Sequence, residues 1–335
     1  MIFILKRDYG QLFGGVMSDK EDSVASSLGV GVGNTIISST DQYYLEKVLG
    51  EGGFGIVFKV RPSKNENVSY AMKLEKKVPE RKEPKLKMEV NILETLQKRN
   101  INQHFTCIYD KGKTKTFFFI VMEMVGKSLA DIKDARAHRV LSPGCGIRVS
   151  IQCLESVEAL HSVEFLHRDL KPANFCIGIC QKKRNVYLLD FGMARKYTNS
   201  KGELKTPRKV VNFKGTLKFA PLRLHEGMEY SRKDDAESWF YMVNDLMNPK
   251  GLPWRMECDL ESIRELKEKW RDEEILLLFF KSLKCKSEFI KIIRLIDNTQ
   301  FTQPVNFKAI YKLMDDAANS YNFSITDLYD WEKEN

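Results

Sequence analysis

The sequence has no hydrophobic run long enough to cross a membrane. Its densest apolar segment covers residues 275–280 and stands between Glu274 and Lys281. A membrane-spanning helix needs about 20 apolar residues, so we interpret this segment as a buried helix. The apolar start of the chain, residues 1–5, is followed at once by charged residues. It is too short for a secretory signal, and we expect no membrane association.

Cysteine is sparse and scattered. The chain has seven cysteines among 335 residues, and none forms a CxxC pair. Cys176 and Cys180 have no second pair or histidine cluster that would complete a zinc site. Dispersed thiols in an odd number are typical of proteins in a reducing compartment. The cysteines therefore predict a cytoplasmic location, with the nucleus as the alternative.

Motifs for nucleic-acid binding are also missing. The net charge is +9, but neither an aromatic-rich RNA-binding motif nor a zinc-finger spacing accompanies it. We therefore expect no nucleic-acid partner. With 43% hydrophobic and 30% charged residues, the composition is that of an ordinary globular chain.

The most informative motif is HRDLKPAN, which begins at His167 and is followed downstream by the triplet DFG. Its spacing supplies the side chains that phosphoryl transfer needs. Asp169 would accept the proton of an incoming hydroxyl, and Lys171 would contact the γ-phosphate. Asn174 and Asp190 would provide the oxygen ligands that Mg²⁺ prefers. One triplet could be a polar surface loop, but the full pattern predicts a site for ATP and Mg²⁺.

A glycine-rich loop lies upstream of this motif. Residues 50–57 read GEGGFGIV, a G-x-G-x-x-G-x-V pattern between two predicted strands. Alone the pattern is weak, because glycine-rich hairpin turns are common. A dinucleotide-binding fold would need a helix after the loop. Between strands, the loop matches a flap whose backbone amides approach nucleotide phosphates. Its predicted members are Gly50, Glu51, Gly52, Gly53, Phe54 and Gly55.

One ion pair is predicted near this loop. Lys73 stands near the end of the strand predicted at 69–74, and Glu89 shares a face of the helix predicted at 84–98 with Leu86 and Leu93. A carboxylate on the inward face of a helix is costly unless it is paired. We expect Lys73 to be the partner of Glu89.

Hydrophobic periodicity divides the chain into two lobes, so we expect an α+β fold. Strands are predicted at 44–49, 56–60, 69–74 and 116–122, whereas the pattern after Gly126 is largely helical. One hairpin, 175–177 with 186–189, interrupts the helices and would hold Asn174 and Asp190 side by side. Residues 1–40 are rich in Ser and Gly, which predicts a flexible leader. The expected boundaries are 41–125 for a small β-rich lobe and 126–332 for a helical lobe.

With these residues, the chain resembles protein kinases over about 41–332. Finer marks resemble the casein kinase I group: residues 214–220 replace the usual Ala-Pro-Glu, and RKDDAES, LPW and a terminal YDWE are present. Residues 87–90 and 197–199 look most similar to the tau-tubulin kinase branch. The resemblance implies a bilobal serine/threonine kinase. A pseudokinase scaffold is the main alternative, although pseudokinases usually lack one of the residues found here.

The resemblance also implies roles for individual residues. Thr216 would contact Asp169 and Lys171, and Asp235 would brace the catalytic loop. Met122 would be the gatekeeper, and the backbone of Glu123 and Val125 would bond the adenine edge. The remaining adenine-pocket residues that it implies are Leu49, Val57 and Ala71.

A basic segment suggests the substrate class. Between Lys196 and Lys218 the chain carries seven basic residues and one acid. A solvated loop is the ordinary interpretation of such a run. Its place after the DFG triplet favours docking of acidic or prephosphorylated protein substrates. Against this, residues 255–261 are acidic where the casein kinase I group has basic residues, and Lys218 alone of that phosphate site is kept. We expect a monomer.

Overall fold

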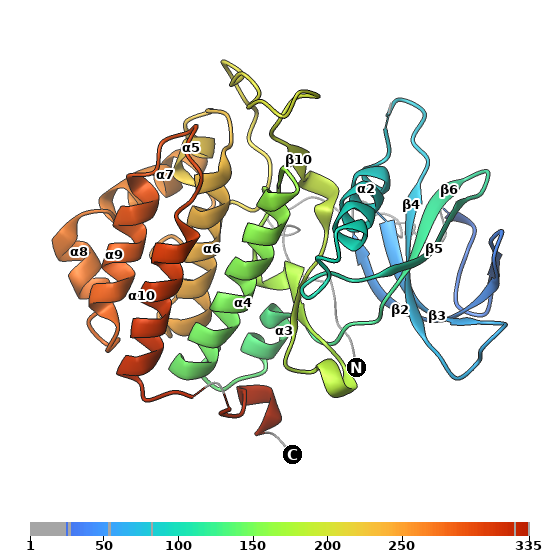
Figure 1. The fold of residues 1–335 in the computed structure, drawn as a ribbon, viewed down its shortest axis with the longest axis horizontal. Coiled ribbons are helices and arrows are strands. Elements are labelled where there is room, and N and C mark those ends of the chain that lie inside the picture. Colours follow the sequence, from blue (N-terminus) through green and yellow to red (C-terminus); the bar gives the residue numbers. More distant parts are fainter. Residues whose placement is uncertain (1–24, 26–27, 53–54, 82, 325, 334–335) are drawn as a thin grey trace, which may run out of the picture.

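A six-stranded antiparallel sheet forms the smaller of two lobes (Figure 1). The computed structural model describes residues 25, 28–52, 55–81, 83–324 and 326–333. The order of the strands in the sheet is β1-β2-β3-β4-β6-β5. Their bounds are Thr35–Ile37 (β1), Gln42–Gly52 (β2), Gly55–Pro62 (β3), Tyr70–Lys76 (β4), Ile108–Lys113 (β5) and Phe117–Met122 (β6). With the helical second lobe, this confirms the predicted α+β, bilobal fold.

Strand β3 shows how the sequence builds this sheet. Its buried residues alternate strictly with half-buried ones, as a strand with different environments on its two faces requires. Ile56, Phe58 and Val60 are fully buried in the core on one face. Val57 therefore points to the opposite face, where it packs with Leu49, Ala71 and Met122.

The sheet begins earlier than the boundary predicted at residue 41. The flexible leader was predicted over residues 1–40. Residues 1–24 and 26–27 lie outside the described residues, so the structure bears only on residue 25 and on residues 28–40. Residues 35–37 pair with β2, and the side chains of Leu28 and Ile36 are buried in the core of the sheet. The few apolar residues of this segment are thus enough to attach residues 28–40 to the lobe.

Strand β5 was not predicted because its sequence, IYDKGK, is mostly polar. Its one carboxylate, Asp110, is buried and contacts the segment between β1 and β2. The Oδ2 atom of Asp110 accepts hydrogen bonds from the hydroxyls of Ser38 at 2.5 Å, Thr40 at 2.5 Å and Tyr43 at 2.9 Å. Burial would raise the pKa of Asp110, but these hydrogen bonds lower it below the ordinary 3.8. Asp110 therefore fastens the turn between β1 and β2.

Replacing Asp110 with Ala is expected to lower the free energy of unfolding by about 1–3 kcal/mol, because the buried Tyr43 hydroxyl and the partly exposed hydroxyls of Ser38 and Thr40 lose their acceptor. Since the folded pKa is lowered, the contribution of Asp110 is present above pH 3.8 and is lost as the pH falls through the folded pKa. Denaturant unfolding at pH 7 measures the effect, with Asp316→Ala on an exposed helix position as the control. Equal midpoints for the two variants would contradict this role.

Helix α2 (Lys85–Lys98) lies against the sheet. Pro84 precedes it and provides no side-chain cap. Instead, Glu75 of β4 accepts hydrogen bonds from the backbone amides of Lys85 at 3.0 Å and Leu86 at 2.5 Å. A carboxylate at a helix N-terminus satisfies free amides and complements the helix dipole. This contact orients α2, and with it Glu89.

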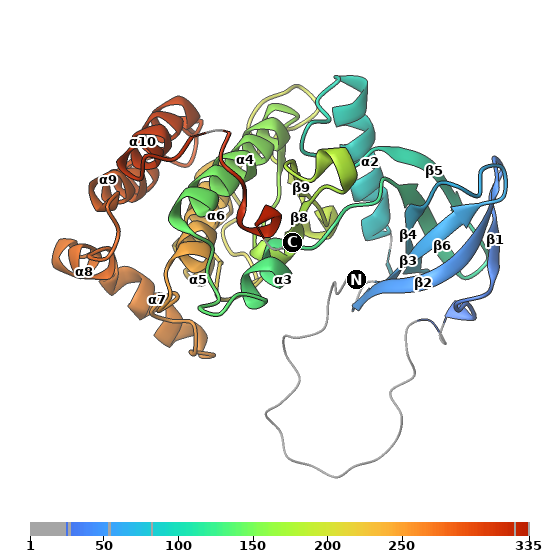
Figure 2. The same cartoon turned by 90° about the horizontal axis from the view of Figure 1, so that it is seen from below.

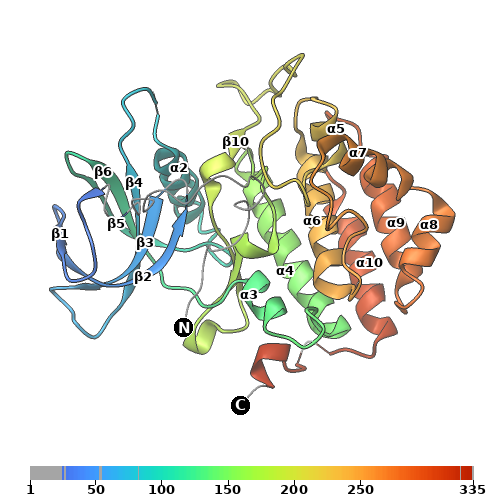
Figure 3. The same cartoon turned by 180° about the vertical axis from the view of Figure 1, so that it is seen from behind.

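The larger lobe is built around two central helices, α4 (Pro143–Ser162) and α6 (Arg232–Met247). Almost every residue of α6 from Asp234 onward is buried, which is typical of a helix surrounded by protein. The other α-helices are α3 (Leu129–Asp134), α5 (Leu222–His225), α7 (Leu260–Lys269), α8 (Glu273–Phe279), α9 (Lys286–Asp297) and α10 (Phe307–Ser320). Figures 2 and 3 show α8, α9 and α10 on the side away from the sheet.

The end of the chain returns to the start of α4. The carboxylate of Asp330 accepts hydrogen bonds from the backbone amide and the hydroxyl of Ser142, both at 2.6 Å. Figure 2 shows this last segment beside α3 and α4. Within the described part of the chain, no helix has both the length and the apolarity that a membrane crossing needs.

Candidate active site

A small hairpin places two of the predicted magnesium ligands next to each other. Strands β8 (Phe175–Ile177) and β9 (Val186–Leu188) pair antiparallel. Asn174 directly precedes β8, and Asp190 lies two residues beyond β9. The backbone amide of Leu189 donates to the carbonyl of Asn174 at 2.8 Å. The hairpin thus brings Asn174 close to Asp190, as its pattern in the sequence predicted.

Asp169 is held by two other residues of the predicted site. Its Oδ1 atom accepts hydrogen bonds from the backbone amide of Thr216 at 2.9 Å and from the Thr216 hydroxyl at 2.8 Å. Its Oδ2 atom lies 3.0 Å from Nζ of Lys171. Lys171 also donates to the Thr216 hydroxyl at 3.1 Å. The three side chains form a closed triangle that fixes the carboxylate of Asp169.

The residue before Thr216 must be glycine. Gly215 has φ +111°, and a Cβ atom added there would lie 3.0 Å from the carbonyl oxygen of Arg168. Positive φ is strained for other residues, and the backbone approaches the catalytic loop closely. Gly215 thus lets the segment of Thr216 reach Asp169.

The residues of the predicted metal site have the donor chemistry that Mg²⁺ requires. The amide nitrogen of Asn174 donates to the carbonyl of Asp169 at 2.8 Å, so its amide oxygen remains for a cation. Burial would raise the pKa of Asp190, but the charge of Lys73 and its hydrogen bond lower it to about 2. Asp190 is therefore ionised near neutral pH. One amide and one carboxylate suit Mg²⁺, which keeps its other positions for phosphate and water.

Lys73, Glu89 and Asp190 form an ion-pair network. The Nζ atom of Lys73 lies 2.6 Å from Glu89 and 3.3 Å from Asp190. Burial by itself would lower the pKa of Lys73, but the two carboxylates raise it above its ordinary value. Lys73 is therefore charged, and α2 stands in the position that brings Glu89 to it. The inward place of Glu89 on the helix predicted this contact.

His167 and Phe191 are buried inside the larger lobe. The ring of Phe191 lies 5.5 Å from His167 and 6.1 Å from Phe105. His167 also accepts the backbone amide of Asp169 at Nδ1, at 3.3 Å.

Asp235 of α6 lies beneath the catalytic loop. It is fully buried, and it accepts the backbone amides of His167 at 2.8 Å and Arg168 at 2.9 Å. Nε2 of His161 and the hydroxyl of Tyr230, each at 2.9 Å, complete its surroundings. Arg168 has φ +71°, a conformation that a non-glycine residue keeps only when the structure around it enforces it. Asp235 provides that enforcement.

The predicted adenine-pocket residues fall into two apolar clusters. Leu49, Val57, Ala71 and Met122 pack in one of them, and Ala71 stands opposite Met122 in the β4–β6 register. Val125 belongs to a second cluster with Cys176, Tyr187 and Leu189. The first cluster belongs to the smaller lobe, and the second joins the linker residue Val125 to the larger lobe.

The glycine loop is described in part. Gly50 and Glu51 pair with Val57 and Ile56 in the β2–β3 hairpin, and Gly52 pairs with Gly55. Gly53 and Phe54 lie outside the described residues. At Gly55, φ is +151° and an added Cβ would come within 1.9 Å of the carbonyl oxygen of Leu74. Only glycine fits there, so this part of the loop is set by backbone packing against β4.

The linker between the lobes begins at Glu123. Its backbone amide donates to the carbonyl of Cys107 at 3.0 Å, so the carbonyl of Glu123 is the group left for an adenine edge. Its side chain contacts Nζ of Lys182 at 2.5 Å, which ties the linker to the larger lobe.

Carboxylates outside the basic segment engage part of its charge. Lys196 pairs with Glu164 at 3.0 Å, and Lys218 pairs with Asp245 at 2.6 Å. Arg208 forms a two-point contact with Glu229, at 2.5 and 2.8 Å. The sequence pattern did not reveal these pairs, because the acids lie far away along the chain.

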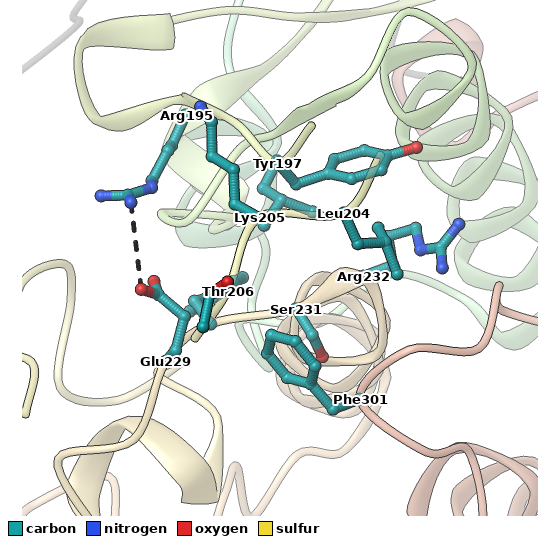
Figure 4. A pocket seen from close by; sticks show the side chains of 11 residues that line it. Arg195, Tyr197, Leu204, Lys205, Thr206, Glu229, Ser231, Arg232 and Phe301 are labelled. Carbon is teal, nitrogen blue, oxygen red and sulfur yellow. Dashed lines mark ion pairs between the residues drawn. The ribbon is translucent and has the colours of Figure 1, made fainter. Parts of the chain in front are cut away.

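Two hollows lie along this segment. The smaller is lined by Tyr197, Lys205, Thr206 and Arg232, among others, and is closed on one side by the pair of Arg195 with Glu229 at 3.9 Å (Figure 4). The larger is a cavity of about 220 Å³. Its lining residues are Arg168, Arg195, Arg208, Val210, Val211, Asn212 and Lys214.

We call this larger hollow the basic cavity. Four of its lining residues are cations, and no acid is among those that the structure places on its wall. Burial lowers the pKa of Arg168, and the neighbouring Arg195 and Arg208 lower it further, as expected where like charges converge. Arg195 was not predicted as part of the basic segment, because it lies one residue before Lys196, where that segment begins. Extending the run by that residue would have found it.

Comparison with known proteins agrees with this geometry. The family described as protein kinase domain matches residues 43–305. A probable serine/threonine-protein kinase of Dictyostelium discoideum is 29% identical over 308 residues, which cover 91% of this chain and 59% of that protein. The chain thus spans less than two thirds of that relative.

Two proteins of Caenorhabditis elegans are also similar. The serine/threonine-protein kinase spe-6 is 30% identical over 88% of this chain and 76% of its own length. A protein provisionally named as a casein kinase I is 32% identical over 68% of this chain and 66% of its own length. The match over most of the chain, together with the arrangement around Asp169, leads to one conclusion: the chain belongs to the protein kinase family, in its serine/threonine class.

Proposed function

We propose that this chain transfers the γ-phosphoryl group of ATP to serine and threonine hydroxyls of proteins, with Asp169 as the proton acceptor. The observation that carries the proposal is the triangle of Asp169, Lys171 and Thr216, placed beside Asn174 and Asp190. Such an arrangement positions a hydroxyl and balances the charge that develops during phosphoryl transfer. A binding scaffold would not need an oriented carboxylate at this point.

ATP and Mg²⁺ are the cofactors in this proposal. Asn174 and Asp190 would hold the metal, and Lys73 would contact the phosphates while Glu89 keeps its amine in place. Bound Mg²⁺ supplies charge neutralisation at the phosphate oxygens. The protein's own contribution is to orient the acceptor hydroxyl and to receive its proton at Asp169.

For the substrate, we propose a preference for acidic or prephosphorylated proteins. The basic cavity supports it, because Arg168 and Lys214 form no ion pair with any of the residues that the structure describes. A phosphate bound by several arginine and lysine side chains forms charge-assisted hydrogen bonds. The cavity adjoins Arg168, the neighbour of Asp169 in the chain, so an anion there would lie near the acceptor.

The basic cavity is a better candidate for this role than Lys218. Asp245 holds the ammonium of Lys218 and also contacts Lys133 at 2.5 Å. The acids of residues 255–261 have local tasks as well: Asp259 accepts the amide of Ser262 at 2.8 Å at the start of α7. Neither feature offers a free cation for a phosphate.

Replacing Lys214 with Glu is expected to raise the KM for a phosphoserine-containing peptide about tenfold, because a charge-assisted contact becomes repulsive. The KM for the same peptide without the phosphate should stay nearly unchanged. Steady-state kinetics with this pair of peptides measures both values.

Lys201→Glu is the matched control for Lys214→Glu. Lys201 is an exposed residue of the same segment that does not line the basic cavity, and its reversal changes the net charge equally. Equal effects of the two variants would assign the preference to the general positive field. Equal loss on both peptides would point to damaged folding.

We also propose membership of the casein kinase I group, on the tau-tubulin kinase-like branch. The Gly215-Thr216 motif and the Caenorhabditis elegans relative support the group. A monomeric state, measurable by sedimentation, and a cytoplasmic or nuclear location complete the proposal. All seven cysteines are free thiols in the structure, which fits such a location.

A further inference from the structure

One lysine of the larger lobe is fully buried and has no carboxylate partner. Lys267 of α7 has 0% of its surface exposed. None of the described residues forms an ion pair with it, whereas the partly buried cations Lys73 and Arg271 contact carboxylates. A buried ammonium is costly unless its donors are satisfied. The acceptors that surround the ammonium of Lys267 therefore indicate its role.

Three acceptors surround the ammonium of Lys267. It donates to the carbonyl oxygens of Leu217 at 3.0 Å and Ala220 at 2.6 Å, and it lies 3.0 Å from Nε2 of His225. Nδ1 of His225 lies 3.3 Å from the carbonyl of Leu260. Since a carbonyl only accepts, the ring proton belongs on Nδ1, and Nε2 accepts from Lys267. The three N–H groups thus meet three acceptors.

Two aromatic rings complete the site of this ammonium. The Nζ atom lies 5.1 Å from the ring centre of Tyr241 and 5.3 Å from that of Trp254. A cation over aromatic faces is stabilised by the ring quadrupoles, most strongly where water is excluded. Trp254 also donates its Nε1 proton to the carbonyl of Lys218 at 2.8 Å. The carbonyls of residues 217 and 220 are therefore held from α7, and that of residue 218 is held from the loop between α6 and α7.

This segment directly follows Thr216, which contacts Asp169. The backbone amides of Phe219 and Ala220 donate to the carbonyl of Thr216 at 3.0 and 2.9 Å. A continuous set of hydrogen bonds therefore connects Lys267 with Thr216 and, through it, with Asp169. We propose that Lys267 is a positioning residue. Its ammonium holds residues 217–220, so that Thr216 and the substrate peptide that carries the acceptor hydroxyl are correctly placed at Asp169. This inference rests on the proposed role of Asp169 as the proton acceptor.

Replacing Lys267 with Met is expected to lower kcat/KM for a peptide acceptor about 10- to 100-fold, because three acceptors lose a charged donor and the segment moves. The KM for ATP should change less than about twofold, since the nucleotide contacts lie elsewhere. Steady-state kinetics in both substrates measures this difference. A lysine that only stabilised the fold would impair the acceptor kcat/KM and the KM for ATP to a similar extent.

Lys269→Met is the matched control. Lys269 stands two residues away on the same helix, is exposed, and forms only a surface pair with Glu265 at 3.6 Å. We expect this variant to keep the wild-type constants. The positioning role is overturned if folded Lys267→Met has an acceptor kcat/KM within about twofold of Lys269→Met, or if its KM for ATP rises by the same factor as acceptor kcat/KM falls.

A second variant tests the same contact if Lys267→Met does not fold. His225→Phe keeps a ring beside Phe213, which now lies 5.3 Å from His225, but removes the nitrogen acceptor. We expect a smaller loss of acceptor kcat/KM, about three- to tenfold, again without a change in the KM for ATP. Unchanged acceptor kinetics in this variant would overturn the proposal.

The pH profile gives a further readout. Burial lowers the pKa of Lys267 to about 7, and burial and Lys267 lower the pKa of His225 to about 4. At pH 6 the ammonium has three donors, and at pH 8.5 the amine has two. The ratio of the acceptor kcat/KM of wild type to that of Lys267→Met should therefore become smaller as the pH rises. The charged or titratable groups facing Lys267 are His225 of α5, Glu237 and Tyr241 of α6, and Arg271 after α7.

The choice of peptide separates this inference from the proposed function. A neutral peptide and its phosphorylated form should lose the same factor in Lys267→Met, because the lysine acts on the backbone of the segment. A wild-type protein without transfer to any protein would refute the proposed function. An active wild type with an unaffected Lys267→Met refutes only the positioning role.

Discussion

Replacing Asp169 with Asn is expected to reduce phosphoryl transfer by about 10²–10⁴-fold, the usual contribution of a proton acceptor in the transition state. Asn has nearly the same shape, and its amide oxygen can still accept the hydrogen bonds of Thr216, now at 2.8 and 2.9 Å. The amide cannot take the proton of the acceptor hydroxyl, and Lys171 loses the negative partner 3.0 Å away. The loss should therefore appear in kcat.

Nucleotide binding should survive this change. Lys73, Glu89 and Asp190 form their own network, and Asp169 takes no part in it. Isothermal titration with a non-hydrolysable ATP analogue and Mg²⁺ measures the affinity, and a peptide assay measures turnover. Asp316→Asn, on the exposed side of α10, is the control. Unchanged turnover in Asp169→Asn would refute its role as the base and would favour a scaffold.

Replacing Asp235 with Ala is expected to destabilise the fold by about 3–5 kcal/mol, the range seen when one partner of a buried charged contact is removed. The backbone amides of His167 and Arg168 would lose their acceptor inside the protein. Each buried donor without a partner costs about 1–3 kcal/mol. Arg168 would also lose the contact that holds its left-handed conformation, so turnover per folded molecule should fall as well.

Denaturant unfolding together with the activity of the folded fraction checks this prediction. Burial would raise the pKa of Asp235, but the hydrogen bond and the charge of His161 lower it below 3.8. Its contribution to stability is therefore present above pH 3.8 and is lost as the pH falls through the folded pKa. Asp235→Ala should lack this part of the acid dependence. A stability within about 1 kcal/mol of Asp316→Ala would contradict the bracing role.

Local patterns were sufficient for much of the fold. The strands that form the centre of the sheet and the helix carrying Glu89 follow from periodicity within a few residues. The sequence missed β5, whose polar residues hide an edge strand, and the attachment of β1. The attachment of β1 comes from pairing with β2 and from buried Leu28 and Ile36. Asp110 of β5 accepts hydrogen bonds from hydroxyls of residues 38–43, a contact between segments well separated in the chain.

The same division applies to the active site. Asp169, Lys171, Asn174 and Asp190 stand in short motifs, where covalent spacing restricts the geometry, so their grouping could be predicted from the order of residues alone. The partners of the basic segment could not be predicted in this way. Lys218 meets Asp245, and Lys267 meets Leu217 and Ala220, because helices α6 and α7 pack beneath that segment. The choice of the proposed catalytic residues thus follows from motif spacing. Long-range packing and burial decide which cations remain free for a substrate. They also decide which side chains hold residues 217–220.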